Sequence, residues 1–159
     1  MVPGGFGTRA LMSPNPLLDW IRAAHETSQW TTSVCTGSML LAAAGVLRGL
    51  EATTHWMSLD RLAEHGARPT LKRVVEQGKV ITAAGVSSGI DMALTLAARI
   101  AGDDVAQAIQ LGIEYDPQPP FSAGSPATAP AHIVEGVRAR MRARMERDEA
   151  AALSRSGST

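Results

Sequence analysis

The pattern of apolar and polar residues predicts helices along most of the chain. A helix over 17–25 follows Asn15-Pro16, a helix-start signal, and residues 39–47 form an apolar run of strong helix formers that closes near Gly49. In a helix over 57–65, ended by Gly66, Leu59 and Leu62 share one face. An apolar helix over 90–100 stops at Gly102. Two further helices are expected over 105–111, capped by Asp103, and over 133–149.

Short strands alternate with these helices. Residues 30–34 are rich in Thr, Val and Trp, which is typical of a strand, and 52–54 form a second candidate. Residues 74–82 predict two short strands around a turn at Gln77-Gly78. The segment 116–130 holds five prolines and is expected to be irregular. The alternation of strands and helices favours an α/β sandwich with a mostly parallel sheet. We expect one domain over 1–150, followed by a disordered tail over 151–159.

Composition limits the partners. The chain has 159 residues, 45% of them apolar and 19% charged, as in an ordinary soluble protein. The net charge is zero, so we expect no nucleic-acid partner and no anionic membrane surface as partner. No apolar run is long enough to span a bilayer, and the first residues lack signal-peptide features. A cytoplasmic location fits the single cysteine.

The only cysteine, Cys35, stands where the strand over 30–34 meets the next helix. A nucleophile at such a sharp turn needs small neighbours, and Ser33 and Gly37 are small. The helix N-terminus favours the thiolate. The alternative interpretation is a buried cysteine chosen for packing. One cysteine excludes an internal disulfide and a cysteine-cluster metal site, and we expect no metal or organic cofactor.

Two glycine-containing segments allow more than one interpretation. Pro3-Gly4-Gly5-Phe6-Gly7 resembles a loop after a strand, yet only two residues precede it, so it is either a flexible end or the sign of a missing beginning. Gly85–Gly89 lacks the lysine and glycine spacing of a phosphate loop. We predict a capping box there instead, with Ser88 as N-cap and Asp91 bonding back to it.

Five motifs occur in order and carry a family resemblance: Val2–Gly5, Ser33–Gly37, Ala52–Trp56, Thr82–Asp91 and Glu114–Phe121. In these the chain resembles the PfpI-like family, the intracellular-protease-like branch of the class I glutamine amidotransferase superfamily. The Cys-Thr pair at 35–36 and the Glu-Tyr-Asp-Pro-Gln-Pro-Pro segment at 114–120 resemble most the subgroup around isonitrile hydratase.

The resemblance implies a flavodoxin-like three-layer sandwich and a homodimer. It also implies that the chain lacks its start. Relatives carry strand–helix–strand material ahead of the Pro-Gly-Gly loop, about 60 residues if each such unit takes about 30. That segment supplies an acidic residue beside the cysteine for proton transfer, and no residue here matches it. We therefore expect little or no turnover from the 159-residue chain alone.

The resemblance also assigns the site. Cys35 matches the nucleophile, and the backbone N–H groups of Gly5 and Thr36 match the pair that stabilises developing negative charge. Histidine follows the cysteine in many relatives, so the threonine here argues against a Cys-His pair. The further pocket residues are Gly4, His55, Val86 and Ser87. Taken without the resemblance, His55 is a structural histidine, and His25, His65 and His132 show no ligand spacing.

The implied reaction is the addition of water to an isonitrile, giving an N-substituted formamide through a Cys35 thioimidate. The partner is then a small isonitrile-like molecule. A second hypothesis is a ligand-sensing domain without catalysis, because the same motifs occur in certain transcription regulators. Only about forty residues follow Asp116, too few for two helix-turn-helix units. A degraded gene product is the third possibility.

Overall fold

The central sheet is mixed. In the computed structural model, which describes residues 1–156, β1 (Thr31–Val34) pairs parallel with β5 (Val80–Ala83), and β5 pairs antiparallel with β4 (Val74–Gln77). Val2 adds an isolated parallel bridge to Ser33 at the other edge of β1. β2 (Glu51–Ala52) and β3 (Arg68–Pro69) form a separate parallel pair. The pairing is thus parallel except in the β4–β5 hairpin, whose turn at Gly78 was predicted.

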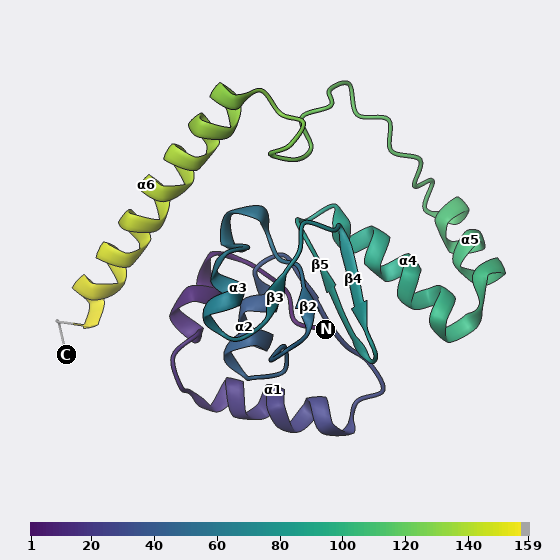
Figure 1. Ribbon diagram of the computed structural model, residues 1–159, viewed down its shortest axis with the longest axis horizontal. Coiled ribbons are helices and arrows are strands. Elements are labelled where there is room, and N and C mark those ends of the chain that lie inside the picture. Colours follow the sequence, from purple (N-terminus) through teal and green to yellow (C-terminus); the bar gives the residue numbers. More distant parts are fainter. Residues whose placement is uncertain (157–159) are drawn as a thin grey trace. The chain divides into compact units, whose positions relative to one another are not determined.

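Helices cover both faces of this sheet, because β5 carries apolar side chains on both of its faces. Val80 packs into a cluster with α1 (Pro16–Thr27) and α2 (Gly37–Ala43). Ile81 and Ala83 point the other way and pack with Met92 of α4 (Ser88–Ala101). Figure 1 shows α1 to α3 on one side of the sheet and α4 on the other. The α/β sandwich expected from the sequence is confirmed.

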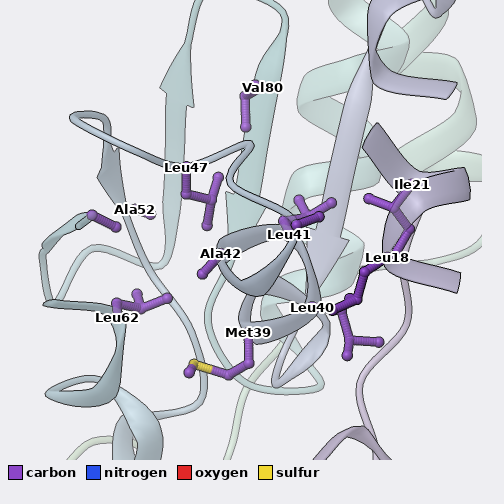
Figure 2. Packing of buried hydrophobic residues seen from close by; sticks show 12 residues of the cluster. Leu18, Ile21, Met39, Leu40, Leu41, Ala42, Leu47, Ala52, Leu62 and Val80 are labelled. Atoms are coloured by element: carbon purple, nitrogen blue, oxygen red, sulfur yellow. The ribbon is translucent and has the colours of Figure 1, made fainter. Parts of the chain in front are cut away.

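The larger cluster lies around α2. Figure 2 shows Leu40 and Leu41 of α2 next to Leu18 and Ile21 of α1. Leu62 of α3 (Arg61–Glu64) belongs to the same cluster. All four leucines and Ile21 are at most 4% exposed. Burial of this kind is the main source of stability in a domain of this size, so the helix that begins behind Cys35 is held firmly.

The helix over 39–47 is shorter than predicted. It ends at Ala43, and Gly45 adopts a φ of 83°. The Gly45 N–H donates to the Ala42 carbonyl, and the Val46 N–H donates to the Leu41 carbonyl at 3.0 Å. This is a Schellman ending, in which glycine supplies the left-handed residue. The chain then turns until Leu50, with Leu47 fully buried.

Other boundaries also differ from the predictions. The helix over 57–65 is two short pieces, η2 (Trp56–Ser58) and α3, and the strand over 52–54 is β2, one residue earlier and two residues long. α5 (Asp103–Gly112) follows α4, with Gly102 rather than Asp103 at its N-cap. A 3-10 helix, η1 (Phe6–Leu11), precedes α1.

The chain divides into two compact units, Met1–Asp116 and Pro117–Thr159. The second contains the irregular proline-rich segment, as predicted, and α6 (Ala131–Ser156). α6 extends to Ser156, and Ala and Leu within 151–156 are strong helix formers. The disordered tail over 151–159 stays a prediction. Its last part, 157–159, lies outside the described residues. Within the described chain, no helix combines the length and the apolar character that crossing a bilayer requires.

Candidate active site

Cys35 occupies a strained backbone position between β1 and α2. Its φ is 56°, in the left-handed region that residues other than glycine rarely adopt. The strand ends at Val34 and the helix begins at Gly37, so the chain reverses within two residues. This is the strand–turn–helix geometry of a nucleophile elbow, as the sequence predicted. Strain of this kind persists only where surrounding structure fixes it.

Hydrogen bonds on both sides fix the elbow. The Cys35 N–H donates to the Ala83 carbonyl at 3.1 Å, which continues the β1–β5 ladder by one residue. The Cys35 carbonyl accepts from the hydroxyls of Ser38 at 3.0 Å and Thr54 at 2.9 Å. Both Ser38 and Thr54 are almost completely buried. The backbone of Cys35 is therefore tied to β5, to α2 and to the chain after β2.

Two glycines allow the N-terminal segment to approach the elbow closely. A Cβ at Gly4 would lie 2.7 Å from the Thr36 nitrogen and 2.8 Å from the Cys35 Cβ. A Cβ at Gly37 would lie 2.2 Å from the Val2 carbonyl oxygen. No side chain fits such spaces without movement of the backbone. Gly4 is thus in contact with Cys35, as its predicted place in the pocket requires.

Gly5 and Thr36, the two predicted backbone donors, lie together. The Gly5 N–H donates to the Thr36 hydroxyl at 3.0 Å, and that hydroxyl lies 3.1 Å from the Gly5 carbonyl, to which it can donate. Gly5 has a φ of 153°. The Gly5 N–H is therefore engaged by the Thr36 side chain, an arrangement that sequence reasoning missed because it considered only the backbone of Thr36.

His55 follows Thr54, whose hydroxyl binds the Cys35 carbonyl. Its Nδ1 accepts a hydrogen bond from the Met57 N–H at 3.4 Å, and its ring lies 5.7 Å from that of Trp56. Burial lowers the pKa of His55 below its usual value of 6.5. The imidazole is thus neutral at pH 7 and acts as the cap of η2. His55 thus follows directly after a residue that binds the Cys35 carbonyl, and it has a structural role. Its place in the pocket stays a prediction.

The loop before α4 also reaches the elbow. It leaves β5 at Ala83, whose carbonyl binds the Cys35 N–H. It returns at Gly89, where a Cβ would lie 3.1 Å from the Val34 side chain. Within this loop Val86 and Ser87 are exposed, Val86 at 81%. The two predicted pocket residues therefore lie on a loop whose ends both contact the neighbours of Cys35.

The predicted capping box at the start of α4 is wrong. Ser88 is the first helical residue, Ser87 is the N-cap, and no side chain caps the helix. Asp91 instead accepts hydrogen bonds from Arg73 Nε at 2.6 Å and from the Tyr115 hydroxyl at 2.7 Å. Partners from distant segments thus outcompete the local bond, and periodicity within one helix could not reveal them.

These contacts keep Asp91 ionised. Burial raises the pKa of its carboxyl, but the hydrogen bonds from Arg73 and Tyr115 outweigh burial and hold the pKa below its usual value. The same bond to Asp91 raises the pKa of the Arg73 guanidinium and of the Tyr115 hydroxyl. An ionised Asp91 is thus a structural anion rather than a proton donor at neutral pH.

An apolar hollow of about 330 Å³ lies beside the N-terminal segment. Residues from Met1 to Gly5 line it together with Leu17 and Ile21 of α1 and Leu40 of α2. Of the predicted site residues it includes Gly4 and Gly5, but not Cys35, His55, Val86 or Ser87. Across residues 1–156, no group of three His, Cys, Asp or Glu side chains is arranged to hold a metal ion.

Comparison with known proteins places this geometry in a family. The model of the DJ-1/PfpI family matches residues 1–99. The chain is 50% identical to isonitrile hydratase of Pseudomonas putida over 139 residues, which cover 87% of this chain and 61% of that enzyme. It is 34% identical to the HTH-type transcriptional regulator CdhR of Pseudomonas aeruginosa over 109 residues, 66% of this chain and 32% of the regulator.

Solved structures of proteins from the same family share the fold of this chain. A ThiJ/PfpI family protein from Pseudomonas syringae superposes with a TM-score of 0.83 at 41% identity, over 91% of this chain and 60% of that one. DJ-1beta of Drosophila melanogaster superposes with a TM-score of 0.62 at 25% identity, over 70% of this chain and 60% of that one. The chain spans less than two thirds of the length of these relatives. The elbow, the matched family model and the shared fold together establish that the chain belongs to the DJ-1/PfpI family.

Proposed function

We propose that this chain provides the nucleophile-bearing part of an isonitrile hydratase, with Cys35 as the nucleophile. The observation that carries the proposal is the strained backbone of Cys35, whose φ is 56°, in a chain 50% identical to an isonitrile hydratase. A left-handed residue between strand and helix exposes its side chain at the turn, where a substrate can reach it. An isonitrile as substrate is supported by the 50% identity to that enzyme.

The reaction proceeds in two steps. The Cys35 sulfur, as thiolate, forms a bond to the terminal carbon of R–N≡C, and that carbon takes up a proton, which gives the thioimidate R–N=CH–S–Cys35. Water then adds across the C=N bond, the C–S bond breaks, and R–NH–CHO leaves while the proton returns to sulfur. The sum is R–N≡C plus water giving R–NH–CHO, so neither oxidant nor reductant is consumed. The covalent adduct divides one difficult addition into two easier ones.

In the second step, electron density moves onto the substrate nitrogen as water adds to the C=N bond. We assign the stabilising role to the backbone N–H groups of Gly5 and Thr36. Since the Thr36 hydroxyl engages the Gly5 N–H at 3.0 Å, the substrate must displace that hydroxyl or share the donor with it. Gly4, His55, Val86 and Ser87 are assigned to the pocket walls. The proton transfers call for a carboxylate, which we expect from the segment that relatives carry ahead of the Pro-Gly-Gly loop.

The test compares the chain with a chimaera that carries the N-terminal segment of the Pseudomonas putida enzyme. Both are given tert-butyl isonitrile, and mass spectrometry follows the formamide and the mass of the Cys35 peptide. We expect many turnovers by the chimaera, and an adduct with little product from the chain alone. Cys35→Ala and Cys35→Ser should both fall to near background, because a hydroxyl is far less nucleophilic than a thiolate at neutral pH. Formamide from Cys35→Ala would place the chemistry elsewhere.

A ligand-sensing role is the second candidate, and the 34% identity to the regulator CdhR favours it. A sensor binds its ligand without turning it over. Product from the chimaera would then never exceed one equivalent per Cys35, while isonitrile would still protect the thiol from iodoacetamide. The same measurement therefore separates the two functions.

A further inference from the structure

The residues that flank the loop from Ala84 to Ser87 contact the elbow. Ala83, just before it, accepts the Cys35 N–H, and Gly89, just after it, lies against Val34. Between these points the side chains of Val86 and Ser87 face solvent, so apolar packing does not hold them. A segment with few buried apolar contacts opens locally at low cost in free energy. Two backbone hydrogen bonds tie the loop to the start of α4, from the Ser88 N–H to the Gly85 carbonyl at 3.0 Å and from the Gly89 N–H to the Val86 carbonyl at 3.1 Å. A tie to a distant segment is needed in addition to fix the loop relative to Cys35.

Arg73 supplies that interaction. Its backbone carbonyl accepts the Ala84 N–H at 2.8 Å, at the start of the loop. Its guanidinium donates to Asp91 through Nε at 2.6 Å, and its Nη2 lies 3.4 Å from the Ser87 hydroxyl, at the end of the loop. One residue thus holds both ends of the segment. An arginine suits this position because its planar fork presents several donors at fixed angles.

Tyr115 completes the arrangement, since its hydroxyl donates to the other carboxylate oxygen of Asp91 at 2.7 Å. Asp91 therefore receives one bond per oxygen, from residues 18 and 24 positions away. We call Arg73, Asp91 and Tyr115 the Asp91 clamp. Its members come from the segment before β4, from α4 and from the segment after α5. Because Tyr115 and Arg73 each bind one oxygen of the Asp91 carboxylate, that carboxylate has a fixed orientation and so orients the Arg73 guanidinium.

We infer that Arg73 is a positioning residue: held by Asp91, which Tyr115 fixes in turn, it keeps the loop Ala84–Ser87 in place beside Cys35. The position of the loop then sets how readily a small electrophile reaches the thiol. As a statement about the reaction, the inference rests on the proposed function. As a statement about the loop and the thiol, it can be tested without any turnover.

The chain contains a matched control. Arg99 donates to Glu76 at 2.9 Å, which ties the other end of α4 to β4. The side chains of Arg99 and Glu76 are 52% and 31% exposed, against 54% and 30% for Arg73 and Asp91. Both pairs join α4 to β4 or to the residue just before it, and their exposures are nearly equal. Only the Arg73 pair contacts the loop, so any difference between the two variants reports on the loop and not on α4 as a whole.

The experiment uses Arg73→Met and Arg99→Met in the 159-residue chain. Amide hydrogen exchange of a peptide covering 84–88 and the rate of iodoacetamide alkylation are measured for both, and Cys35 is the only thiol to be alkylated. We expect Arg73→Met to raise both rates about 2- to 5-fold, the factor that a partly exposed ion pair supplies, while Arg99→Met leaves them unchanged. Arg73→Lys should restore part of the protection and Tyr115→Phe should lose part of it.

A third measurement addresses the reaction. The rate of Cys35 adduct formation is followed against tert-butyl isonitrile concentration, which separates the half-saturating concentration from the maximal rate. We expect Arg73→Met to raise the half-saturating concentration about 2- to 5-fold, because a loosened loop no longer holds Val86 and Ser87 as pocket walls against the isonitrile. The maximal rate should stay nearly unchanged, because the thiol itself is intact, while iodoacetamide needs no pocket and reacts faster with the more accessible thiol. No adduct in the unsubstituted chain would refute the proposed function while exchange and alkylation still decide the inference. Equal effects of Arg73→Met and Arg99→Met, or none from Arg73→Met, would overturn the inference.

Discussion

α2 begins two residues after Cys35, and α4 begins next to Val34, the residue before Cys35. The two helices pack on opposite faces of one sheet, yet they differ in how deeply they are buried. The first six residues of α2, from Gly37 to Ala42, are all buried. In α4 the buried residues are Ser88 and Met92, and Ile90 and Ile100 are 38% and 63% exposed. α1, α3 and η1 all contact α2, whereas α4 contacts β4, β5 and α5. The difference lies in how many layers of apolar side chains surround each helix.

This difference assigns separate tasks to the two sides of the site. The α2 side fixes the Cys35 backbone in a strained conformation, which demands dense packing and buried hydrogen bonds. The α4 side carries the exposed loop with Val86 and Ser87, and polar contacts replace packing there. A group that must keep a precise geometry is held better by rigid elements, whereas loops on a rigid scaffold commonly supply binding contacts.

The largest difference is expected for large-to-small substitutions. Leu41 of α2 is fully buried, whereas Leu96 of α4 is partly buried against the smaller cluster. Leu41→Ala should destabilise the protein by about 2–5 kcal/mol, since it leaves a cavity in the main core. Leu96→Ala should cost about 1 kcal/mol, as is typical of a single substitution. Urea unfolding of both variants measures this, and equal losses would contradict the contrast between the helices.

A smaller difference is expected for the glycines in the first turn of each helix. A Cβ at Gly37 would lie 2.2 Å from the Val2 carbonyl oxygen, and a Cβ at Gly89 would lie 3.1 Å from the Val34 side chain. Backbone cannot give way locally, so Gly37→Ala should cost about 1–3 kcal/mol. A side chain can shift, and alanine favours the helix, so Gly89→Ala should be close to neutral.

Hydrogen exchange locates the damage. The Val34 N–H donates to the Val2 carbonyl, the atom that a Cβ at Gly37 would displace. Gly37→Ala should therefore speed exchange at Val34, while Gly89→Ala should not. A Gly37→Ala protein as stable as the unsubstituted chain would mean that the segment before the elbow moves freely, and the account of a rigid α2 side would fail.

The sequence predicted the elements whose signals are local. The helix from Pro16 has the predicted start, since the Asn15 side chain accepts the Leu17 N–H at 2.9 Å. The hairpin turn at Gly78 and the elbow at Cys35 were also found, because glycine and a strand–cysteine–helix order mark them directly. The resemblance then named a family that the comparisons confirm.

What the sequence could not predict depends on contacts between distant residues. The Asp91 clamp joins residues 18 and 24 positions apart, so the nearby capping partner was preferred in error. The end of α2 was missed for another reason: Gly45 lies within an apolar run, and its stop signal was read as part of the helix. The engagement of Gly5 by the Thr36 hydroxyl needs the fold that brings positions 31 residues apart into contact.

A third prediction concerns the strain at Cys35. Its φ of 56° costs a residue with a Cβ about 1–2 kcal/mol, and glycine adopts this region freely. Glycine also loses about 0.5–1 kcal/mol through the greater freedom of the unfolded chain. Cys35→Gly should therefore be more stable than Cys35→Ala by about 0.5–1 kcal/mol in urea unfolding, although both lack the thiol. If Cys35→Ala is the more stable variant, the packing on the α2 side does not hold a strained residue at this point.

The smallest effect is expected from pH and tests the polar contacts that fasten α1 on the α2 side. His25 Nδ1 lies 2.8 Å from the Thr31 hydroxyl, and the Lys79 ammonium donates to the His25 carbonyl and, at 3.2 Å, to that of Ser28. Burial first, and then the Lys79 charge, lower the pKa of His25 below 6.5. The unfolded chain therefore takes up a proton at higher pH than the folded chain does. The contribution is fully present above pH 6.5 and is lost as pH falls through the lower folded value. His55, whose pKa burial also lowers, acts in the same direction.

The urea midpoint should thus be lower at pH 5.5 than at pH 8. His25→Gln should remove part of that decrease. The control His132→Gln, at an exposed position of α6, should leave the decrease unchanged. A decrease unchanged by His25→Gln would show that α1 is fastened by its apolar face alone.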